Sequence, residues 1–491
     1  KAPSPGILEG VLPGAAALVE GNDAEALSLL QAAAAADPAS SLTWVFVGEA
    51  ARRCGRHEES SAALEKAFEA GGDETVLLAL GSSYHRSGRV VDALEMFKRV
   101  LRMRPDDPEV HFHLGTCFLE VGEHARALDE FRVVQTLRPT FPGLHLRTGV
   151  AMARLGRALG AIESFKEALR VDPSDAEAHF QLGEIYLDLG RAKDAFDAYR
   201  EAGRLDPDHA PSLQGLGLAC RELGRMQDAL KAFQEVARIN PGDAMAHRHM
   251  GLVLDRIGRS REALDAYARA IEARPEDAEA HYQSGLVSRK LNEPERAVAS
   301  FRRVVELRPQ HADAHAHLGF LYRDLGRPQE SLDAFRAVTE ARPTDSQAFN
   351  NLGNAYSALG QDKEAVEVFI KAVRLSPDYA EAFVNLGGAL LRYGKPEESL
   401  KALQEAIRLL PEHPRAHCNL GATYIALEKL SEAAASLKKA VSLDPNLAET
   451  RYQMGRLQVR VNDRNAAFAE YKRLQELDPA LAEKLFKEVY G

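Results

Sequence analysis

Residues 346–379 read SQAFNNLGNAYSALGQDKEAVEVFIKAVRLSPDY, and this stretch decides the fold of the chain. Apolar residues recur at helical spacing before Gly360 and again after it, which predicts two helices joined by a turn at that glycine. Pro377 ends the second helix because proline cannot continue one. Gly353 lies inside the first helix, where a glycine costs about 1 kcal/mol relative to alanine. We therefore expect a close approach of two helix backbones at Gly353.

The glycine at position 353 recurs with a fixed period along the chain. Every step is 34 residues except the 33 residues from Gly48 to Gly81. The full series is Gly14, Gly48, Gly81, Gly115, Gly149, Gly183, Gly217, Gly251, Gly285, Gly319, Gly353, Gly387, Gly421 and Gly455. A proline follows 24 residues after each of them, except that Gly72 takes this place after Gly48. The pattern predicts fourteen helical hairpins in one register.

The turn between the paired helices is usually a glycine, which supplies the left-handed conformation that closes the first helix. Asn292 and Asn462 stand at this position in two hairpins and tolerate the conformation. For Glu428 the left-handed conformation costs free energy, so the hairpin that contains Glu428 has the least favourable turn.

The repeat at residues 346–379 carries a Leu-Gly pair followed by Tyr, Ala, Phe and Pro at set offsets. This pattern resembles that of the tetratricopeptide repeat family. The resemblance covers residues 7–479. It implies an all-α, right-handed superhelical solenoid of antiparallel helix pairs, whose first helices line a concave face. It implies no chemistry.

The repeat pattern sets the expected domain organisation. Each hairpin buries its apolar face only against its neighbours, so residues 7–479 are expected to form one solenoid. Residues 1–6 precede the pattern and are expected to be a flexible lead. Residues 480–491 carry apolar and charged side chains at helical spacing, which predicts an amphipathic capping helix over the last hairpin.

The composition narrows the classes of partner. The chain has 62 basic and 72 acidic residues, evenly mixed and without a polybasic run, which disfavours nucleic acid and anionic membranes as partners. No stretch approaches the roughly 18 to 20 apolar residues of a membrane span. The four cysteines lie far apart, which favours reduced thiols and a cytoplasmic location. Because the chain begins at Lys1 without Met, a trimmed leader or preceding domain stays open.

The histidines do not predict a catalytic or metal site. Seven of the sixteen lie four residues before a repeat glycine, where the family places a bulky, half-buried residue. These seven are His111, His145, His179, His247, His281, His315 and His417. The His-x-His pairs that some of them form do not have the i, i+4 spacing of a helical metal site. We expect no metal, no cofactor and no enzymatic activity in this chain.

The family resemblance points to a polar ladder on the concave face. Family members turn the residue two positions before the repeat glycine into the groove, and here that position is rich in Asn, Gln and His. Amides offer both a donor and an acceptor, so such a row can bind the main chain of an extended peptide. The alternative is that these amides are common in the family and bond locally. The predicted peptide-binding residues are Asn350, Asn351, Asn354, Asn385, Arg415 and Asn419.

The ladder residues relate to a known subset of the family. Asn350, Asn354, Asn385, Arg415 and Asn419 occupy the five positions that hold a peptide C-terminus in the family's carboxylate-clamp subset. Asn350 and Asn419 replace two of its residues and only one cation, Arg415, remains. This departure favours recognition of peptide backbone over a C-terminal carboxylate.

Two further surfaces follow from the same positions. An apolar strip that could receive a partner helix consists of Val384, Leu391, Cys418, Ile425, Tyr452 and Val459, with packing between repeats as the alternative. A basic ridge is suggested by Arg221, Arg289 and Arg323, which each lie four residues after a repeat glycine. Nearby acidic residues are expected to neutralise it.

The sequence therefore predicts a non-catalytic protein–protein interaction scaffold that binds extended or helical segments of other proteins in its groove. The alternative is the substrate-recognition arm of a larger enzyme, such as a protein glycosyltransferase, whose asparagine ladder this one resembles. Usage rich in Ala, Arg and Gly suggests a bacterial protein. By analogy, such an array would serve an assembly or polarity machine, with a small GTPase or a pilus or envelope component as partner.

Overall fold

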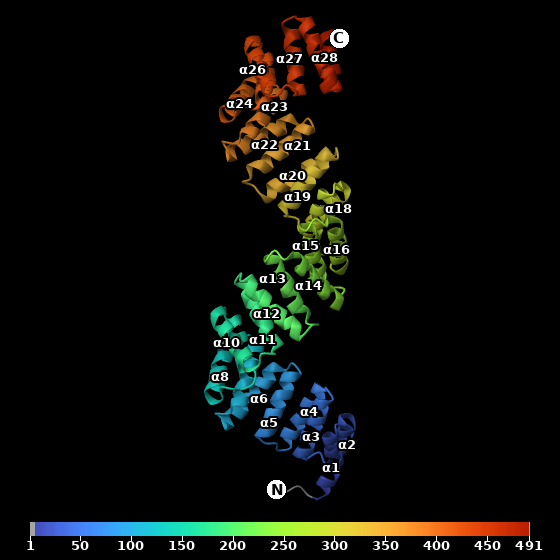
Figure 1. The fold of residues 1–491 in the computed structure, drawn as a ribbon, viewed down its shortest axis with the longest axis vertical. Coiled ribbons are helices and arrows are strands. Elements are labelled where there is room, and N and C mark those ends of the chain that lie inside the picture. Colours follow the sequence, from blue (N-terminus) through green and yellow to red (C-terminus); the bar gives the residue numbers. More distant parts are fainter. Residues whose placement is uncertain (1–4, 491) are drawn as a thin grey trace. The chain divides into compact units, whose positions relative to one another are not determined.

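A computed structural model describes residues 5–490 of the chain, and the side chains of residues 11–489. The described residues form 29 helices and no strand (Figure 1). The chain divides into two compact units, Lys1–Pro241 and Gly242–Gly491, and each is described by itself. The predicted all-α fold of antiparallel helix pairs is confirmed, whereas a single solenoid over residues 7–479 stays a prediction.

The first unit contains seven helix pairs. Each helix packs on the next along the chain, so the second helix of one pair contacts the first helix of the following pair. Its helices are α1 (Pro5–Glu20), α2 (Asp23–Ala36), α3 (Ser41–Arg53), α4 (His57–Glu69), α5 (Glu74–Arg86), α6 (Val90–Met103), α7 (Pro108–Glu120), α8 (His124–Leu137), α9 (Leu144–Arg154), α10 (Ala158–Val171), α11 (Ala176–Asp188), α12 (Ala192–Leu205), α13 (Ala210–Glu222) and α14 (Met226–Ile239).

The second unit contains seven more pairs and a final single helix. Its helices are α15 (Ala244–Arg256), α16 (Ser260–Ala273), α17 (Ala278–Lys290), α18 (Pro294–Leu307), α19 (Ala312–Asp324), α20 (Pro328–Ala341), α21 (Ser346–Ala358), α22 (Asp362–Leu375), α23 (Ala380–Arg392), α24 (Pro396–Leu409), α25 (Pro414–Ala426), α26 (Leu430–Leu443), α27 (Ala448–Arg460), α28 (Arg464–Leu477) and α29 (Pro479–Tyr490).

With the exception of Gly455, the repeat glycines lie beneath a large side chain of the following helix. A Cβ placed on Gly353 would come within 2.5 Å of the Phe369 ring in α22, and one on Gly217 would come within 2.6 Å of the Phe233 ring in α14. The expected contact of two helix backbones is therefore wrong. The glycine instead lets a ring or leucine side chain lie directly on the backbone of the first helix, where it is fully buried.

The repeat prolines end each pair by acting on the residue before them. Ser376, which precedes Pro377, has φ −137° and ψ 89° and caps α22 in an extended conformation. Such a conformation is what a following proline ring imposes. The first helix of the next pair then begins behind a new N-cap, often an aspartate: Asp345 accepts hydrogen bonds from the backbone N–H groups of Gln347 and Ala348.

The turns inside the pairs are left-handed, including the three without glycine. Asn292, Glu428 and Asn462 have φ of 59°, 58° and 62°. The Glu428 turn thus has the same form as its neighbours, with α25 ending at Ala426 and α26 beginning at Leu430. The predicted hairpin is present there despite the unfavourable residue, because packing of the two helices outweighs a local cost of about 1–2 kcal/mol.

The C-terminal helix α29 packs on α27 and α28. Its Leu485 is fully buried and lies over Gly455, taking the place that a side chain of the second helix holds in the other pairs. Residue 491 lies outside the described residues. At the other end, residues 1–4 of the predicted lead also lie outside them, and Pro5 and Gly6 belong to α1.

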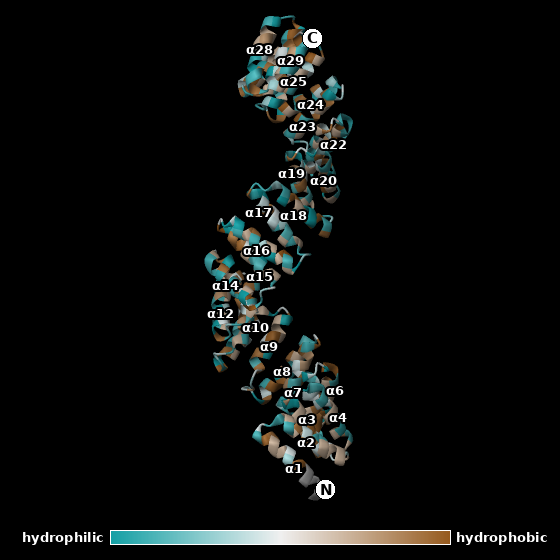
Figure 2. Ribbon diagram, turned by 90° about the vertical axis from the view of Figure 1, so that its right-hand side faces the viewer, coloured by the Kyte–Doolittle hydropathy of each residue, from teal (hydrophilic) through white to brown (hydrophobic). Residues whose placement is uncertain are grey.

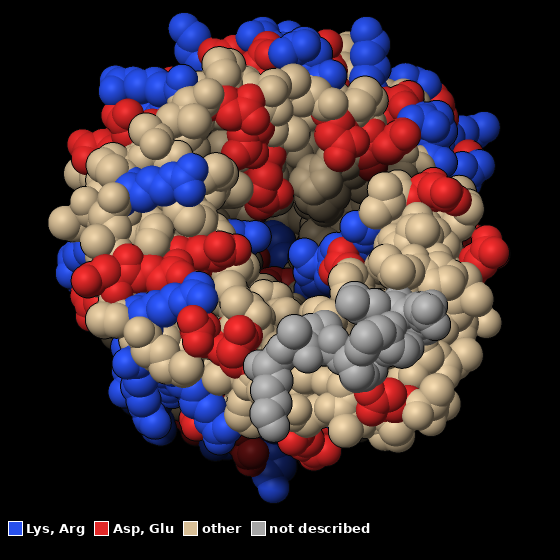
Figure 3. All heavy atoms as spheres, turned by 90° about the horizontal axis from the view of Figure 1, so that it is seen from below, with Lys and Arg blue, Asp and Glu red and all other residues tan. Residues whose placement is uncertain are grey.

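Hydrophobic and hydrophilic residues are interspersed along the helices, as expected where each helix buries one face (Figure 2). Basic and acidic side chains are also intermixed on the face shown in Figure 3. None of the described helices is long and apolar enough to cross a membrane. The four cysteines are free thiols, and burial raises the pKa of Cys220 and Cys418 to about 11 and that of Cys117 to about 12.

Candidate functional site

A small polar pocket lies where three successive first helices, α21, α23 and α25, meet. Its volume is about 270 Å³, and Asn354, Asn385 and Asn419 line it, one from each helix. Arg392 and Arg415 complete its polar wall. We call this the amide pocket. The 34-residue period explains the convergence, because it brings the same face of each first helix to the same side of the array.

Gly388 makes room for the amide pocket. It directly follows the repeat glycine Gly387 and lies in the pocket lining on α23. A Cβ at this position would come within 3.2 Å of the Asn419 amide nitrogen. A side chain there would therefore fill the space between Asn419 and α23.

Three of the predicted residues form hydrogen bonds within the chain. The Asn385 amide donates to the side-chain oxygen of Asn350, 2.9 Å away, and the Asn419 amide donates to the backbone oxygen of Val384 at 3.4 Å. Asn350 is buried, so its oxygen needs this donor. Asn385 and Asn419 thus line the pocket and also bond within the chain.

The structure separates the six predicted peptide-binding residues into two groups. Asn354, Asn385, Arg415 and Asn419 lie together in the amide pocket. Asn350 and Asn351 are not among the described residues that line it. Both lie on α21, where Asn350 is buried and Asn351 is half-buried.

The two arginines of the pocket differ in how firmly they are held. Arg392 donates to Asp362 at 2.8 Å and to the Ser357 hydroxyl at 3.0 Å. Arg415 is 59% exposed, and its guanidinium is 3.8 Å from Glu381. Because a surface pair of that length contributes little, Arg415 can turn towards a ligand, while Arg392 forms a fixed wall.

The sequence did not single out Arg392, Gly388, Ser357 or Glu449, all of which line the pocket. Arg392 lies five residues after its repeat glycine, outside the positions that the family turns into the groove. The Gly-Gly pair at 387–388 is a signal that could have been used, since a second glycine in a helix calls for its own explanation.

The predicted apolar strip is mostly covered by the chain itself. Val384, Cys418, Ile425 and Tyr452 are buried, and the other two members, Leu391 and Val459, are half-buried. The Tyr452 hydroxyl donates to Glu488 of α29 at 2.5 Å. These positions pack between repeats, so the expectation of an exposed strip for a partner helix is corrected.

Two of the three arginines of the predicted basic ridge pair with an acidic neighbour, as expected. Arg221 pairs with Glu222 at 3.0 Å and Arg323 with Asp324 at 2.9 Å. Arg289 is different, because its guanidinium donates to Nδ1 of His317 at 2.5 Å. His317 is therefore neutral, and both burial and the charge of Arg289 hold its pKa below the ordinary value.

The repeat histidines are structural. Seven histidines lie four residues before a repeat glycine. In five of them, the ring Nε2 is 2.9–3.2 Å from the carbonyl oxygen of the repeat proline that precedes the histidine: His111, His179, His281, His315 and His417. The ring thus ties the start of each first helix to the end of the preceding hairpin. Among the residues that the structure describes, no group of three or more His, Cys, Asp or Glu side chains is arranged to hold a metal ion.

Comparison with known families identifies the class of protein. A tetratricopeptide repeat profile matches residues 78–142, 146–210, 204–244, 250–312, 282–346 and 384–448, and a second TPR repeat profile matches residues 353–394. The matched residues make up more than half of the chain. The chain belongs to the tetratricopeptide repeat family.

Solved structures of similar proteins cover parts or most of the chain. YrrB, described as a TPR protein with an unusual peptide-binding site, is 28% identical, with 38% of this chain and 96% of that chain covered and a TM-score of 0.34. The APC/C hetero-tetramer Cut9-Hcn1 is 15% identical, with 91% and 96% covered and a TM-score of 0.39. PilF of Pseudomonas aeruginosa is 21% identical, with 43% and 97% covered and a TM-score of 0.36. No curated protein matches the chain.

Proposed function

We propose that this chain is a non-catalytic scaffold that binds other proteins, and that the amide pocket holds the main chain of an extended peptide segment. Proteins of the family bind other proteins or peptides, so the array itself supports the scaffold function. The observation that carries the finer proposal is the convergence of Asn354, Asn385 and Asn419 on one pocket.

The chemistry of the pocket favours peptide backbone. A peptide group needs one acceptor for its N–H and one donor for its C=O, and each asparagine side chain offers both. The pocket also has an arginine on either side, and Glu449 adds one carboxylate. With a volume of about 270 Å³, the pocket suits one or two backbone units, with the ligand's side chains left outside.

The test uses a peptide selected on the immobilised full chain from a display library of random short peptides. Replacing Asn354 and Asn419 together by Ala should weaken this peptide by on the order of tenfold to a hundredfold, since each amide–backbone hydrogen bond contributes roughly 0.5–1.5 kcal/mol. The measurement is a titration by fluorescence anisotropy, with circular dichroism as the folding control. Asn385 is left in place because it satisfies the buried Asn350.

Two variants sharpen the comparison. Asn351→Ala is the matched control, since it removes a ladder amide outside the pocket and should leave the affinity unchanged. Gly388→Leu keeps every polar group but fills the pocket, and it should abolish binding. Equal loss in Asn351→Ala and the double variant would show that the peptide follows the ladder and not the pocket. Full affinity in Gly388→Leu would rule the amide pocket out.

A further inference from the structure

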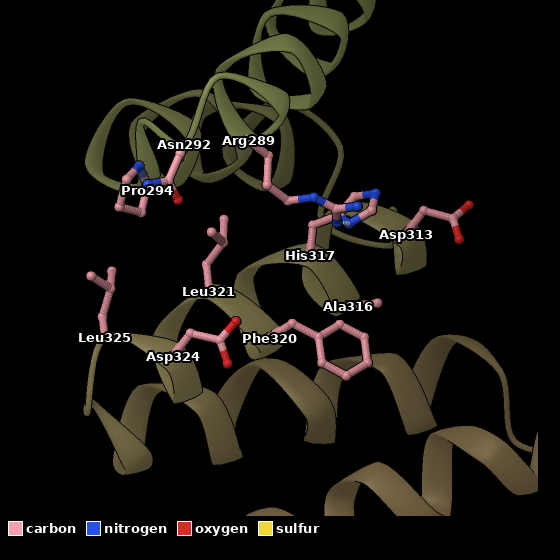
Figure 4. Close-up of a pocket in the computed structure, with 10 residues that line it drawn as sticks. All are labelled: Arg289, Asn292, Pro294, Asp313, Ala316, His317, Phe320, Leu321, Asp324 and Leu325. Atoms are coloured by element: carbon pink, nitrogen blue, oxygen red, sulfur yellow. Dashed lines mark hydrogen bonds between the residues drawn. The ribbon is translucent and has the colours of Figure 1, made fainter.

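A second and larger pocket lies in the same unit, between the α17–α18 hairpin and α19. Its volume is about 710 Å³. Phe320 and Leu321 of α19, Leu325 just after it and Pro294 of α18 supply apolar surface (Figure 4). We call this the anchor pocket. A pocket of this volume has room for a large aromatic side chain together with part of the segment that carries it.

The polar edge of the anchor pocket is formed by Arg289, Asp313 and Asp324. Asp324 contacts its neighbour Arg323 at 2.9 Å, and Asp313 accepts a hydrogen bond at 2.9 Å from Arg342, the residue that follows α20. The two carboxylate side chains are 64% and 54% exposed, so solvent screens these pairs and both groups can face a cation of a ligand.

The Arg289 guanidinium is held in place at the wall of the pocket. It donates to His317, whose ring stacks on Phe301 with the centroids 4.8 Å apart. Figure 4 shows Arg289 extending from α17 towards His317 on α19, on the opposite side of the pocket from Phe320. A planar cation facing an aromatic ring across a gap favours an aromatic occupant, which can contact the ring and the guanidinium together.

We infer that the anchor pocket receives an aromatic side chain of a partner protein's segment, with a Lys or Arg next to it in that segment. The aromatic residue contacts Phe320 and Arg289, and the basic neighbour faces one of the two carboxylates, Asp313 or Asp324, which lie at opposite ends of α19. The inference rests on the proposed scaffold function, but it does not depend on the amide pocket. The anchor pocket would make the scaffold selective among peptide sequences. The amide pocket binds peptide backbone whatever its side chains, whereas the anchor pocket favours an aromatic side chain.

The experiment sequences the peptides that the full chain enriches from the random display library. We expect enrichment of an aromatic residue with a Lys or Arg within two positions of it. An enriched peptide is then titrated against Asp313→Lys combined with Asp324→Lys, which should weaken it about tenfold or more because attraction becomes repulsion. Asp129→Lys combined with Asp197→Lys is the matched control, since both aspartates are exposed on the first unit.

Ala316→Trp provides a second variant that retains all charges. Ala316 lies in the pocket lining, so the added indole should fill the cavity and remove binding of the aromatic peptide. A library that yields no binder would overturn the scaffold function and this inference together. Enriched peptides that lose affinity in Gly388→Leu but keep it in Ala316→Trp and in the Asp313/Asp324 variant would overturn this inference alone.

Discussion

At the scale of the residue, the repeat glycines show how one missing side chain shapes each hairpin. We expect Gly217→Val to lower the free energy of unfolding by about 1–3 kcal/mol, because its side chain would collide with the Phe233 ring. Gly203→Val is the matched control: it also lies inside a helix, but its Cβ would meet Leu213 at an ordinary 3.6 Å. Chemical denaturation measures both. Equal midpoints for the two variants would contradict the role assigned to Gly217.

The half-buried histidine His317 gives a second prediction for single residues. Its pKa is lowered by burial and then by Arg289, from an ordinary value of 6.5. Below that pH the unfolded chain binds the proton more readily, so the contribution of His317 to stability is complete above pH 6.5 and is lost as the pH falls through the folded pKa.

We therefore expect His317→Phe to reduce the loss of stability on acidification, measured as the shift of the thermal midpoint between neutral pH and mildly acidic buffer. His113→Phe should act alike in the first unit, since burial also lowers the pKa of His113, which stacks on Phe97. A midpoint that falls as steeply in both variants as in the wild type would refute this account.

At the scale of the element, α29 closes the second unit by placing Leu485 over Gly455. Replacing this fully buried leucine by alanine should cost about 2–5 kcal/mol, through lost burial and the cavity left behind. The damage should stay local because each hairpin contacts only its neighbours. Hydrogen exchange would show it as faster exchange in α27 and α28, with α15 to α20 unchanged.

The control for this element is Lys487→Ala, because the Lys487 side chain is 72% exposed and makes only a surface ion pair with Glu483. It should leave the exchange rates of α27 and α28 as they are. If Leu485→Ala did the same, α29 would not be a cap.

At the scale of the whole molecule, stability should be distributed along the array. A fragment of residues 1–309 ends at a repeat proline. Its helical circular dichroism signal per residue should be close to that of the full chain. Its unfolding midpoint should be lower because it lacks neighbours. The absence of helical signal in this fragment would show that the hairpins do not fold through local contacts.

The sequence by itself determined the hairpins, because a helix, its proline stop and its turn depend on residues close together in the chain. The spacing of Gly353, Gly360 and Pro377 predicts α21 and α22, and the same spacing extends to the other pairs. The role of the repeat histidines as packing residues follows from their register together with the family resemblance.

Only the tertiary structure decided what each groove position contacts. Asn350 and Asn354 both lie on α21, yet one is buried against Asn385 and the other lines a pocket. Likewise Tyr452 is covered because α29 folds back over α27. Helical periodicity gives the direction in which a side chain points from its own helix, whereas burial depends on which side chains a neighbouring helix places there.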